Sequence, residues 1–300
     1  MESGDAVKHQ PAFDVISLAS QPCRQTAGHV RIDLIFPTAS FANADYPMTS
    51  SSSLLSSKPI PSAERLIFAL DVPNPTVARQ LVETLGDAVC FYKIGLEMFM
   101  AGGYFELIEW LRARDKKVFV DLKFFDVPET VRSAVRQLKP HGATFTTVHG
   151  NDAMLEAAVA AAQEIGGDLG ILAVTALTSL DQADLNDLGF ACDPKTLVLS
   201  RARRALEIGC RGVISSGLEA ADLRASLGQK LLIVTPGIRP VLNRPTDDQK
   251  RTMDVEEAFL SGADYIVVGR PIRQAPDPQA AAAAIQERIA HLFAANASVV

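Results

Sequence analysis

From residue 64 onward, the chain alternates between two patterns of hydrophobic and polar positions. Short apolar runs rich in β-branched and aromatic residues are followed by longer amphipathic stretches rich in Ala and Leu. The short runs have the length and composition of buried strands, and the longer ones have the periodicity of helices. The predicted strands cover residues 66–70, 89–94, 117–121, 143–148, 169–174, 212–215, 231–234 and 264–268. The predicted helices cover residues 75–85, 97–114, 129–139, 152–165, 195–208, 218–226, 254–261 and 278–293.

This repetition predicts an α/β fold built on a parallel sheet. Eight strand–helix repeats in about 230 residues match a closed (β/α)8 TIM barrel that forms a single domain, which we place at residues 63–296. A doubly wound open sheet is the alternative, because it shows the same alternation of strands and helices. The active sites of such barrels lie at the C-terminal ends of the strands, so polar residues there are the candidates for chemistry.

Residues 1–62 differ in composition from the rest of the chain. They contain scattered Pro, Ser, Gln and Thr without sustained periodicity, and they end in a Ser-rich stretch that is typical of a linker. Acidic residues near the start and the lack of a long apolar segment argue against a signal peptide or an organellar presequence. We therefore expect a poorly ordered, non-catalytic N-terminal extension. An alternative is that Met48 is the true start and the preceding segment is an artefact.

Composition excludes several classes of protein. A chain of 300 residues that is 48% hydrophobic and 21% charged is typical of a globular protein with a large core. A net charge of −6 argues against a nucleic-acid-binding protein. The 4 cysteines and 5 histidines lack the spacing of metal ligands or of a disulfide framework, so we expect no metal and a reducing, cytoplasmic location. No apolar run approaches the roughly 18 residues needed to cross a membrane.

Charged residues gather where the first three predicted strands end. Asp121 and Lys123 close the third strand, with Asp126 shortly after them, while Lys93 ends the second strand and Asp71 follows the first. Residues two apart in a strand share a face, so Asp121 and Lys123 should point the same way with Cα atoms roughly 7 Å apart. A lone Asp-x-Lys pair would more often be a helix cap with a surface partner. Alternating acidic and basic residues on three strand ends instead favour an active site.

The last two strands run into glycine- and arginine-containing loops. The seventh is followed by Pro236, Gly237 and Arg239, and the eighth by Gly269 and Arg270. Either loop alone would be interpreted as a turn with a surface charge. Together they stand where barrels usually bind phosphate, with backbone amides near the glycines and a guanidinium for the phosphate oxygens.

Two further segments contribute candidate ligand-binding residues. Residues 239–252 form a long polar loop that suits a lid, and Gln249 within it is a candidate phosphate ligand. Ser179 follows the fifth strand, where a hydroxyl can contact the amide edge of a ligand, although Ser and Thr at strand ends are often caps.

These motifs resemble the orotidine 5′-phosphate decarboxylase family over residues 64–293, in order and with suitable spacing. Glu129 stands where the family often has Asn, and residues 1–62 have no counterpart there. The matching segments are Phe68-Ala-Leu-Asp71, Lys93-Ile-Gly-Leu-Glu97, Asp121-Leu-Lys123-Phe-Phe-Asp126-Val-Pro-Glu-Thr130, Thr175-Ala-Leu-Thr-Ser179, Thr235-Pro-Gly-Ile-Arg239-Pro and Val268-Gly-Arg270-Pro.

The resemblance implies decarboxylation of orotidine 5′-phosphate to uridine 5′-phosphate without a cofactor, the last step of UMP biosynthesis. It places Asp121 beside the substrate carboxylate and makes Lys123 the proton donor to C6. It further implies a homodimer in which Asp126 and Thr130 complete the site of the neighbouring subunit.

The remaining roles implied by the resemblance concern binding of the substrate. Asp71 and Lys93 would hold the ribose hydroxyls, and Ser179 would contact the pyrimidine. The phosphate would be bound by Gln249, Arg270 and the backbone amides around Gly237 and Gly269, and Pro236 and Arg239 would also belong to the substrate-binding site.

Two rival functions remain open. Hexulose-phosphate synthases and keto-gulonate-phosphate decarboxylases resemble the same D-x-K-x-x-D core but use Mg²⁺, and they typically have an acidic residue where this chain has Lys93. A catalytically inactive barrel that senses a nucleotide phosphate is the second rival. The intact set of Asp71, Lys93, Asp121 and Lys123 argues against it.

Overall fold

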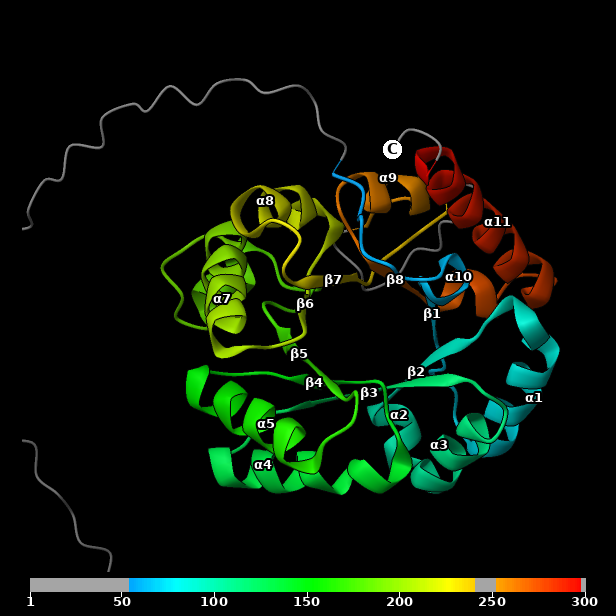
Figure 1. The fold of residues 1–300 in the computed structure, drawn as a ribbon, viewed down its shortest axis with the longest axis horizontal. Coiled ribbons are helices and arrows are strands. Elements are labelled where there is room, and N and C mark those ends of the chain that lie inside the picture. Colours follow the sequence, from blue (N-terminus) through cyan, green and yellow to red (C-terminus); the bar gives the residue numbers. More distant parts are fainter. Residues whose placement is uncertain (1–53, 241–251, 298–300) are drawn as a thin grey trace, which may run out of the picture. The chain divides into compact units, whose positions relative to one another are not determined.

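A computed structural model describes residues 54–240 and 252–297 of the chain. Its eight strands are all parallel, and they close into a barrel in sequence order because β1 pairs with both β2 and β8. Figure 1 shows the strands as a ring surrounded by helices. The strands are β1 (Leu66–Ala69), β2 (Phe91–Gly95), β3 (Lys117–Phe124), β4 (Phe145–Val148), β5 (Gly170–Val174), β6 (Gly212–Ile214), β7 (Leu232–Thr235) and β8 (Tyr265–Val268). The predicted (β/α)8 barrel is confirmed, and the open-sheet alternative is wrong.

Helices follow each strand and cover the outside of the barrel (Figure 1). They are α1 (Pro75–Leu85), α2 (Leu96–Met100), α3 (Tyr104–Arg112), α4 (Pro128–Gln137), α5 (Asp152–Ile165), α6 (Gln182–Asp187), α7 (Pro194–Ile208), α8 (Gly217–Leu227), α9 (Val255–Leu260), α10 (Arg270–Arg273) and α11 (Pro278–Ala297). Short 3-10 turns lie at Ser62–Glu64, Gly86–Ala88 and Lys139–His141.

The predicted helix over residues 97–114 is two helices in the structure. Gly102 and Gly103 separate α2 from α3, and both adopt left-handed backbone angles, with φ of 80° and 67°. A side chain would strain this conformation, whereas glycine adopts it freely. The short helices α6 and α10 were not predicted, because each is less than two turns long and carries no extended hydrophobic periodicity.

The strands bury both faces, as a parallel sheet surrounded by helices requires. In β1, Ile67 and Ala69 face the barrel interior, whereas Leu66 and Phe68 pack in the layer between the barrel and the helices. Aromatic rings fill the interior below the C-terminal end: the centroid of the Phe145 ring lies 5.5 Å from those of Phe91 and Tyr265, and 6.2 Å from that of Phe119. This packed interior forms a floor for any site at the C-terminal end of the strands.

A strap formed by residues 54–61 packs at the other end of the barrel. Leu55 and Ser56 are buried, and the Ser56 hydroxyl and Lys58 Nζ both donate to the fully buried Asp264, which directly precedes β8. Arg224 from α8 also binds this carboxylate. The sequence assigns residues 54–61 to the poorly ordered N-terminal extension, but in the structure they pack against the barrel. The predicted lid over residues 239–252 falls mostly outside the described residues.

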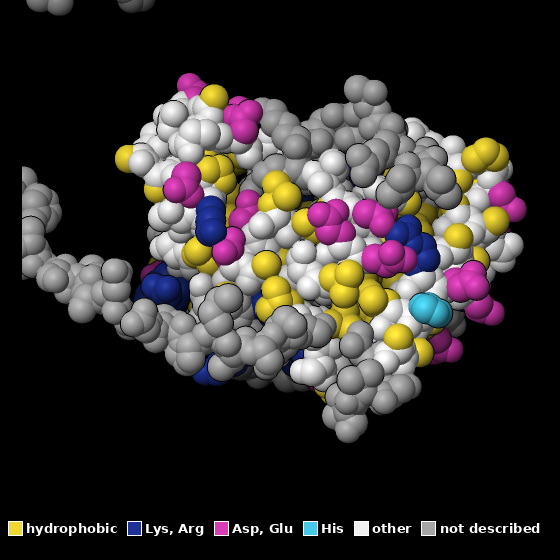
Figure 2. Space-filling view, turned by 90° about the horizontal axis from the view of Figure 1, so that it is seen from above, with side chains coloured by type: hydrophobic (Ala, Val, Ile, Leu, Met, Phe, Trp, Pro, Cys, Tyr) yellow, Lys and Arg dark blue, Asp and Glu magenta, His cyan; other side chains and the backbone are white. Residues whose placement is uncertain are grey.

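The face of the molecule shown in Figure 2 is of mixed charge. On the face that Figure 2 shows, lysines and arginines are scattered among acidic and hydrophobic side chains and form no basic patch. None of the helices in the described ranges is long and apolar enough to span a bilayer.

Candidate active site

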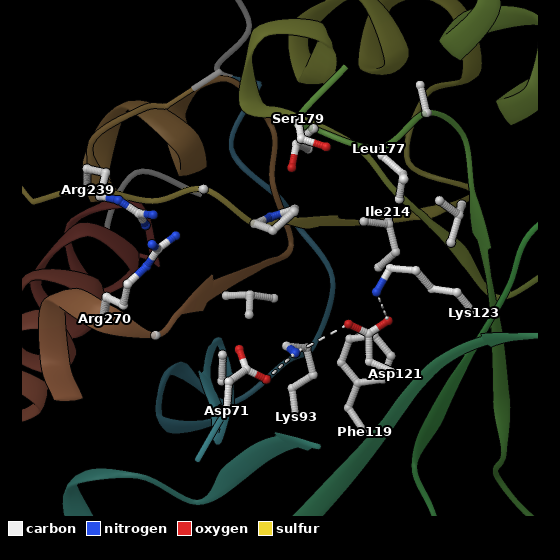
Figure 3. Close-up of a pocket in the computed structure, with 18 of the residues that line it drawn as sticks. Asp71, Lys93, Phe119, Asp121, Lys123, Leu177, Ser179, Ile214, Arg239 and Arg270 are labelled. Atoms are coloured by element: carbon white, nitrogen blue, oxygen red, sulfur yellow. Dashed lines mark hydrogen bonds and ion pairs between the residues drawn. The ribbon is translucent and has the colours of Figure 1, made fainter. Parts of the chain in front are cut away.

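A cavity of about 570 Å³ opens at the C-terminal ends of the strands. Residues from the ends of β1, β2, β3, β5, β6, β7 and β8 line it, so the barrel brings together groups that are far apart in the sequence (Figure 3). Its lining comprises Ala69, Asp71, Lys93, Phe119, Asp121, Lys123, Val174, Ala176, Leu177, Thr178, Ser179, Ile214, Pro236, Gly237, Arg239, Val267, Gly269, Arg270 and Arg273.

Four of these residues form a continuous array of alternating charge on one side of the cavity (Figure 3). Lys93 Nζ lies 3.2 Å from Asp71 Oδ1 and 3.3 Å from Asp121 Oδ2. Lys123 Nζ lies 2.9 Å from Asp121 Oδ1. The predicted grouping of Asp71, Lys93, Asp121 and Lys123 at one rim is thus found in the structure. We call these four residues the charge array.

Burial and charge oppose each other within the array. Burial by itself lowers the pKa of Lys93, but the carboxylates of Asp121 and Asp71 outweigh it and hold this pKa above its ordinary value. Burial likewise raises the pKa of Asp121, and Lys93 and Lys123 outweigh it so that the net shift is downward. Both groups are therefore ionised at neutral pH, and each stabilises the charge of the other.

The backbone at the end of β3 departs from a regular strand. Lys123 has a φ of +48°, in the left-handed region that few non-glycine residues adopt. Val120 pairs with Thr146 and Phe124 with Val148, so residues 121–123 lie opposite the single residue Thr147. Asp121 and Lys123 do face the same cavity, as predicted. Strand alternation is not the whole reason, because this bulge redirects the chain.

Thr147 joins the two catalytic candidates of β3. Its hydroxyl donates to Asp121 Oδ1 at 2.9 Å and accepts the backbone N–H of Lys123 at 2.9 Å. Thr147 is fully buried and does not appear among the described residues that line the cavity. Sequence reasoning missed it, since a Thr in a strand is typical of a β-branched packing residue.

A group of arginines faces the charge array across the cavity. Figure 3 shows the guanidinium groups of Arg239 and Arg270 close to each other on that side. Arg273, three residues after Arg270 and therefore on the same face of α10, also lines the cavity. It was not predicted, although its spacing from Arg270 was a usable signal.

The segments after β7 and β8 each carry a glycine next to this arginine group in the sequence: Gly237 stands two residues before Arg239, and Gly269 directly precedes Arg270. Gly237 has a φ of +79°, which favours glycine. A Cβ added at Gly269 would lie 3.2 Å from the Cβ of Ala69, so a side chain there would crowd the end of β1. Both glycines line the cavity, where backbone N–H groups without a neighbouring side chain can approach an anion.

The remaining predicted residues divide into three groups. Ser179 lines the cavity with Thr178, and Figure 3 shows it on the opposite side from Asp71. Asp126 and Thr130 are exposed and lie outside the lining, with Asp126 Oδ1 accepting the N–H of Val127 at 2.7 Å. Gln249 lies outside the described residues.

The donor set of the array does not suit a divalent cation. Such ions need free carboxylate oxygens, but the Lys93 ammonium stands between the carboxylates of Asp71 and Asp121. Within residues 54–240 and 252–297, no group of three or more His, Cys, Asp and Glu side chains is arranged to hold a metal ion.

Comparison with known proteins identifies a family. The model of the orotidine 5′-phosphate decarboxylase / HUMPS family matches residues 64–285. A curated relative from Methylococcus capsulatus, named orotidine 5′-phosphate decarboxylase, is 63% identical over 242 residues, covering 81% of this chain and 98% of its own. A relative of the same name from Stenotrophomonas maltophilia is 50% identical, over 79% of this chain and 98% of its own. The crystal structure of orotidine 5′-phosphate decarboxylase from Lactobacillus acidophilus matches with a TM-score of 0.66 and 36% identity, covering 75% of this chain and 99% of that one.

Proposed function

The chain belongs to the orotidine 5′-phosphate decarboxylase / HUMPS family, and we propose that it decarboxylates orotidine 5′-phosphate to uridine 5′-phosphate with Lys123 as the proton donor. The observation that carries this proposal is the charge array. Lys123 Nζ is held by Asp121 at the edge of the cavity, and its side chain is 35% exposed, so the ammonium is available to a bound ligand. The reaction that we propose uses no cofactor.

The array suits a reaction that leaves negative charge on carbon. As the bond from C6 to the carboxylate breaks, carbon dioxide leaves and the electron pair stays on C6, in the plane of the ring. The Lys123 ammonium stabilises this pair and then transfers a proton to it, which leaves a neutral amine that solvent reprotonates. Asp121, bound by Lys93 and Thr147 as well as Lys123, keeps the ammonium in place.

Asp121 also raises the energy of the bound substrate. Two like charges 4 Å apart repel by about 4 kcal/mol at an effective dielectric constant of 20. We place the substrate carboxylate beside Asp121, so this repulsion is relieved as carbon dioxide departs. Binding of the remote phosphate offsets it in the ground state.

The arginine side of the cavity is our proposed phosphate site. Arg239 and Arg270 would bind the phosphate oxygens together with the backbone around Pro236, Gly237 and Gly269. Gln249, which lies outside the described residues, remains a predicted phosphate ligand. We assign the ribose hydroxyls to Asp71 and Lys93, and the pyrimidine to Ser179.

We further propose a homodimer with shared active sites. Asp126 and Thr130 face solvent in the single chain. Large hydrophobic side chains are exposed on α2, which follows β2, and on the segment after β3, the strand next to it: Leu96, Phe99, Met100, Phe125 and Val127. Exposed apolar side chains gathered in this way are typical of a protein interface. A second copy covering this surface would bring Asp126 and Thr130 to its own cavity.

The location that we propose is the cytoplasm. Cys90, Cys192 and Cys210 are free thiols, which fits a reducing compartment.

A spectrophotometric assay of orotidine 5′-phosphate turnover tests the function. We expect turnover that is insensitive to EDTA, and we expect Lys123→Ala to lose it almost completely. A strict requirement for Mg²⁺ would instead favour the sugar-phosphate enzymes that resemble this barrel. Turnover by Lys123→Ala within about tenfold of the parent would contradict the assigned proton donor.

A mixed dimer tests the shared site. Chains carrying Asp126→Asn are combined with chains carrying Lys123→Ala, each of which is expected to be inactive alone. In one of the two sites of a mixed dimer, the Asp126→Asn chain supplies an intact Lys123 and the Lys123→Ala chain supplies an intact Asp126, so activity should return. Without any return of activity, the composite site would be wrong.

A further inference from the structure

We infer that Thr147 is a positioning residue for the charge array, because its hydroxyl sets the orientation of the Asp121 carboxylate and the backbone conformation that presents Lys123. This inference rests on the proposed function, since it concerns how the same array is held. Thr147 itself does not face the substrate: it is fully buried and stands outside the described lining of the cavity.

The directions of the two hydrogen bonds follow from the chemistry of the groups. A backbone N–H only donates and an ionised carboxylate only accepts. The Thr147 hydroxyl must therefore accept from the N–H of Lys123 and give its single proton to Asp121 Oδ1, both at 2.9 Å. One hydroxyl thus connects the side chain of one array member to the backbone of another.

The backbone of Lys123 needs such a partner. Its left-handed conformation, with a φ of +48°, costs an L-residue free energy unless neighbouring interactions hold it. Residues 121–123 face only Thr147 on β4, so the bulge lacks a regular ladder of main-chain hydrogen bonds across this stretch. The hydroxyl of Thr147 fills that gap for the Lys123 amide.

The carboxylate of Asp121 is fixed through the same hydroxyl. Its Oδ1 accepts from Thr147 and Lys123, and its Oδ2 lies 3.3 Å from Lys93 Nζ. Both lysines are long and flexible, whereas Thr147 has a short side chain on a buried strand. Thr147 is therefore the rigid contact that sets which oxygen faces which ammonium.

The surroundings of Asp121 define what its titration reports. Lys93 from β2 and Lys123 from β3 face it, and Asp71 lies beyond Lys93. The pKa of the Tyr104 phenol from α3 is raised by burial and, to a smaller extent, by this carboxylate. Against the effect of burial, the lysines and the Thr147 hydroxyl lower the pKa of Asp121. Loss of the hydroxyl should move this pKa upward.

The test compares Thr147→Val and Thr147→Ser with a matched control, Thr146→Val. Thr146 is the preceding residue of β4, is equally buried, and donates its hydroxyl to the backbone oxygen of Val120 at 3.1 Å. The control therefore removes a buried hydroxyl and a hydrogen bond to β3 without touching the array. For each variant, kcat and KM are measured as a function of pH, together with the midpoint of thermal unfolding.

We expect Thr147→Val to lower kcat by about 10- to 100-fold, the usual effect of removing a hydrogen bond to a charged group. KM should change by less than about threefold, because the arginine side of the cavity is untouched. The acidic limb of the kcat profile should move to higher pH. Thr147→Ser keeps the hydroxyl and should restore kcat and the pH profile, while Thr146→Val should lose thermal stability without a shift of the acidic limb.

Three results would overturn the inference. These are a parental kcat and pH profile in Thr147→Val, equal effects in Thr147→Val and Thr146→Val, or a Thr147→Ser variant as impaired as Thr147→Val. If Thr147→Val does not fold, Thr147→Cys makes the same comparison, because a thiol has a similar size but is a weak donor. The parent chain distinguishes failure of this inference from failure of the proposed function. If the parent itself does not turn over orotidine 5′-phosphate, the proposed function is wrong.

Discussion

Asp264, the buried carboxylate at the N-terminal end of the barrel strands, gives the sharpest prediction on stability. Asp264 is fully buried and accepts from Arg224 Nη2, from Lys58 Nζ at 3.0 Å, from the Ser56 hydroxyl and from the backbone N–H of Ile233 at 2.8 Å. The substitution Asp264→Asn keeps the shape of the side chain and removes its charge. Two cations then lose their counterion, one of them in a fully buried position.

The magnitude follows from the burial of each partner. Removing one member of a buried ion pair costs about 3–5 kcal/mol. Arg224 keeps three backbone acceptors, the carbonyls of Gly228, Leu231 and Gly262, so the lower part of that range applies to it. We therefore expect Asp264→Asn to lower the free energy of unfolding by about 3 kcal/mol. Lys58→Met leaves the carboxylate its bonds from Arg224, Ser56 and Ile233, so we expect a smaller loss of about 1 kcal/mol, the usual net worth of a hydrogen bond.

Urea unfolding followed by the fluorescence of Trp110, the one tryptophan of the chain, measures both values. Protein concentration must be the same for all variants, because a dimer is stabilised by mass action. Catalytic activity serves as the control: it should stay at the parental level in both variants, since the carboxylate lies at the opposite end of the barrel from the cavity. A loss below about 1 kcal/mol in Asp264→Asn, or an equal loss in Lys58→Met, would refute this account of the strap.

Three further predictions concern the cavity and the core. Lys93→Met removes the ammonium between two carboxylates, so kcat for orotidine 5′-phosphate should fall by at least about 100-fold in the spectrophotometric assay. A decrease of kcat by less than about tenfold would contradict the role of Lys93 in the charge array. Arg273→Ala should lower kcat/KM for orotidine 5′-phosphate by about tenfold and leave the reaction of orotidine, which lacks the phosphate, unchanged; equal losses for both substrates would exclude a phosphate role. Burial raises the pKa of the Cys210 thiol to about 12, so the thiol stays protonated at pH 8 and should resist iodoacetamide until the chain unfolds. Mass spectrometry of the labelled protein measures this, and labelling as fast as that of the partly exposed Cys192 would contradict it.

Much of the fold was predictable because it depends on local patterns. Parallel strands buried on both faces and helices with one apolar face leave a clear signal in the sequence. Closure of the barrel does not, since the pairing of β1 with β8 joins residues about 200 positions apart and an open sheet shows the same alternation. The break at Gly102 and Gly103 did have a local signal, two adjacent glycines within a predicted helix.

The site was predictable where its residues stand at strand ends in a distinctive order. Asp71, Lys93 and Asp121 could be placed by the ends of their strands alone. Thr147 could not be placed, because its importance comes from a partner 26 residues away across a bulge. The contact between Lys58 and Asp264 joins residues 206 positions apart, so the order of residues 54–61 was likewise not predicted.

The left-handed backbone at Lys123 has a consequence for protein design. Judged by conformation alone, position 123 favours Gly or Asn, the residues that adopt a positive φ most readily. Judged by the proposed chemistry, it requires an ammonium. A redesign that optimises each residue for its backbone would therefore replace Lys123, gain stability and lose the reaction. The two demands conflict at this one residue, and such conflicts between stability and activity mark positions that a stabilised version of this barrel has to leave unchanged.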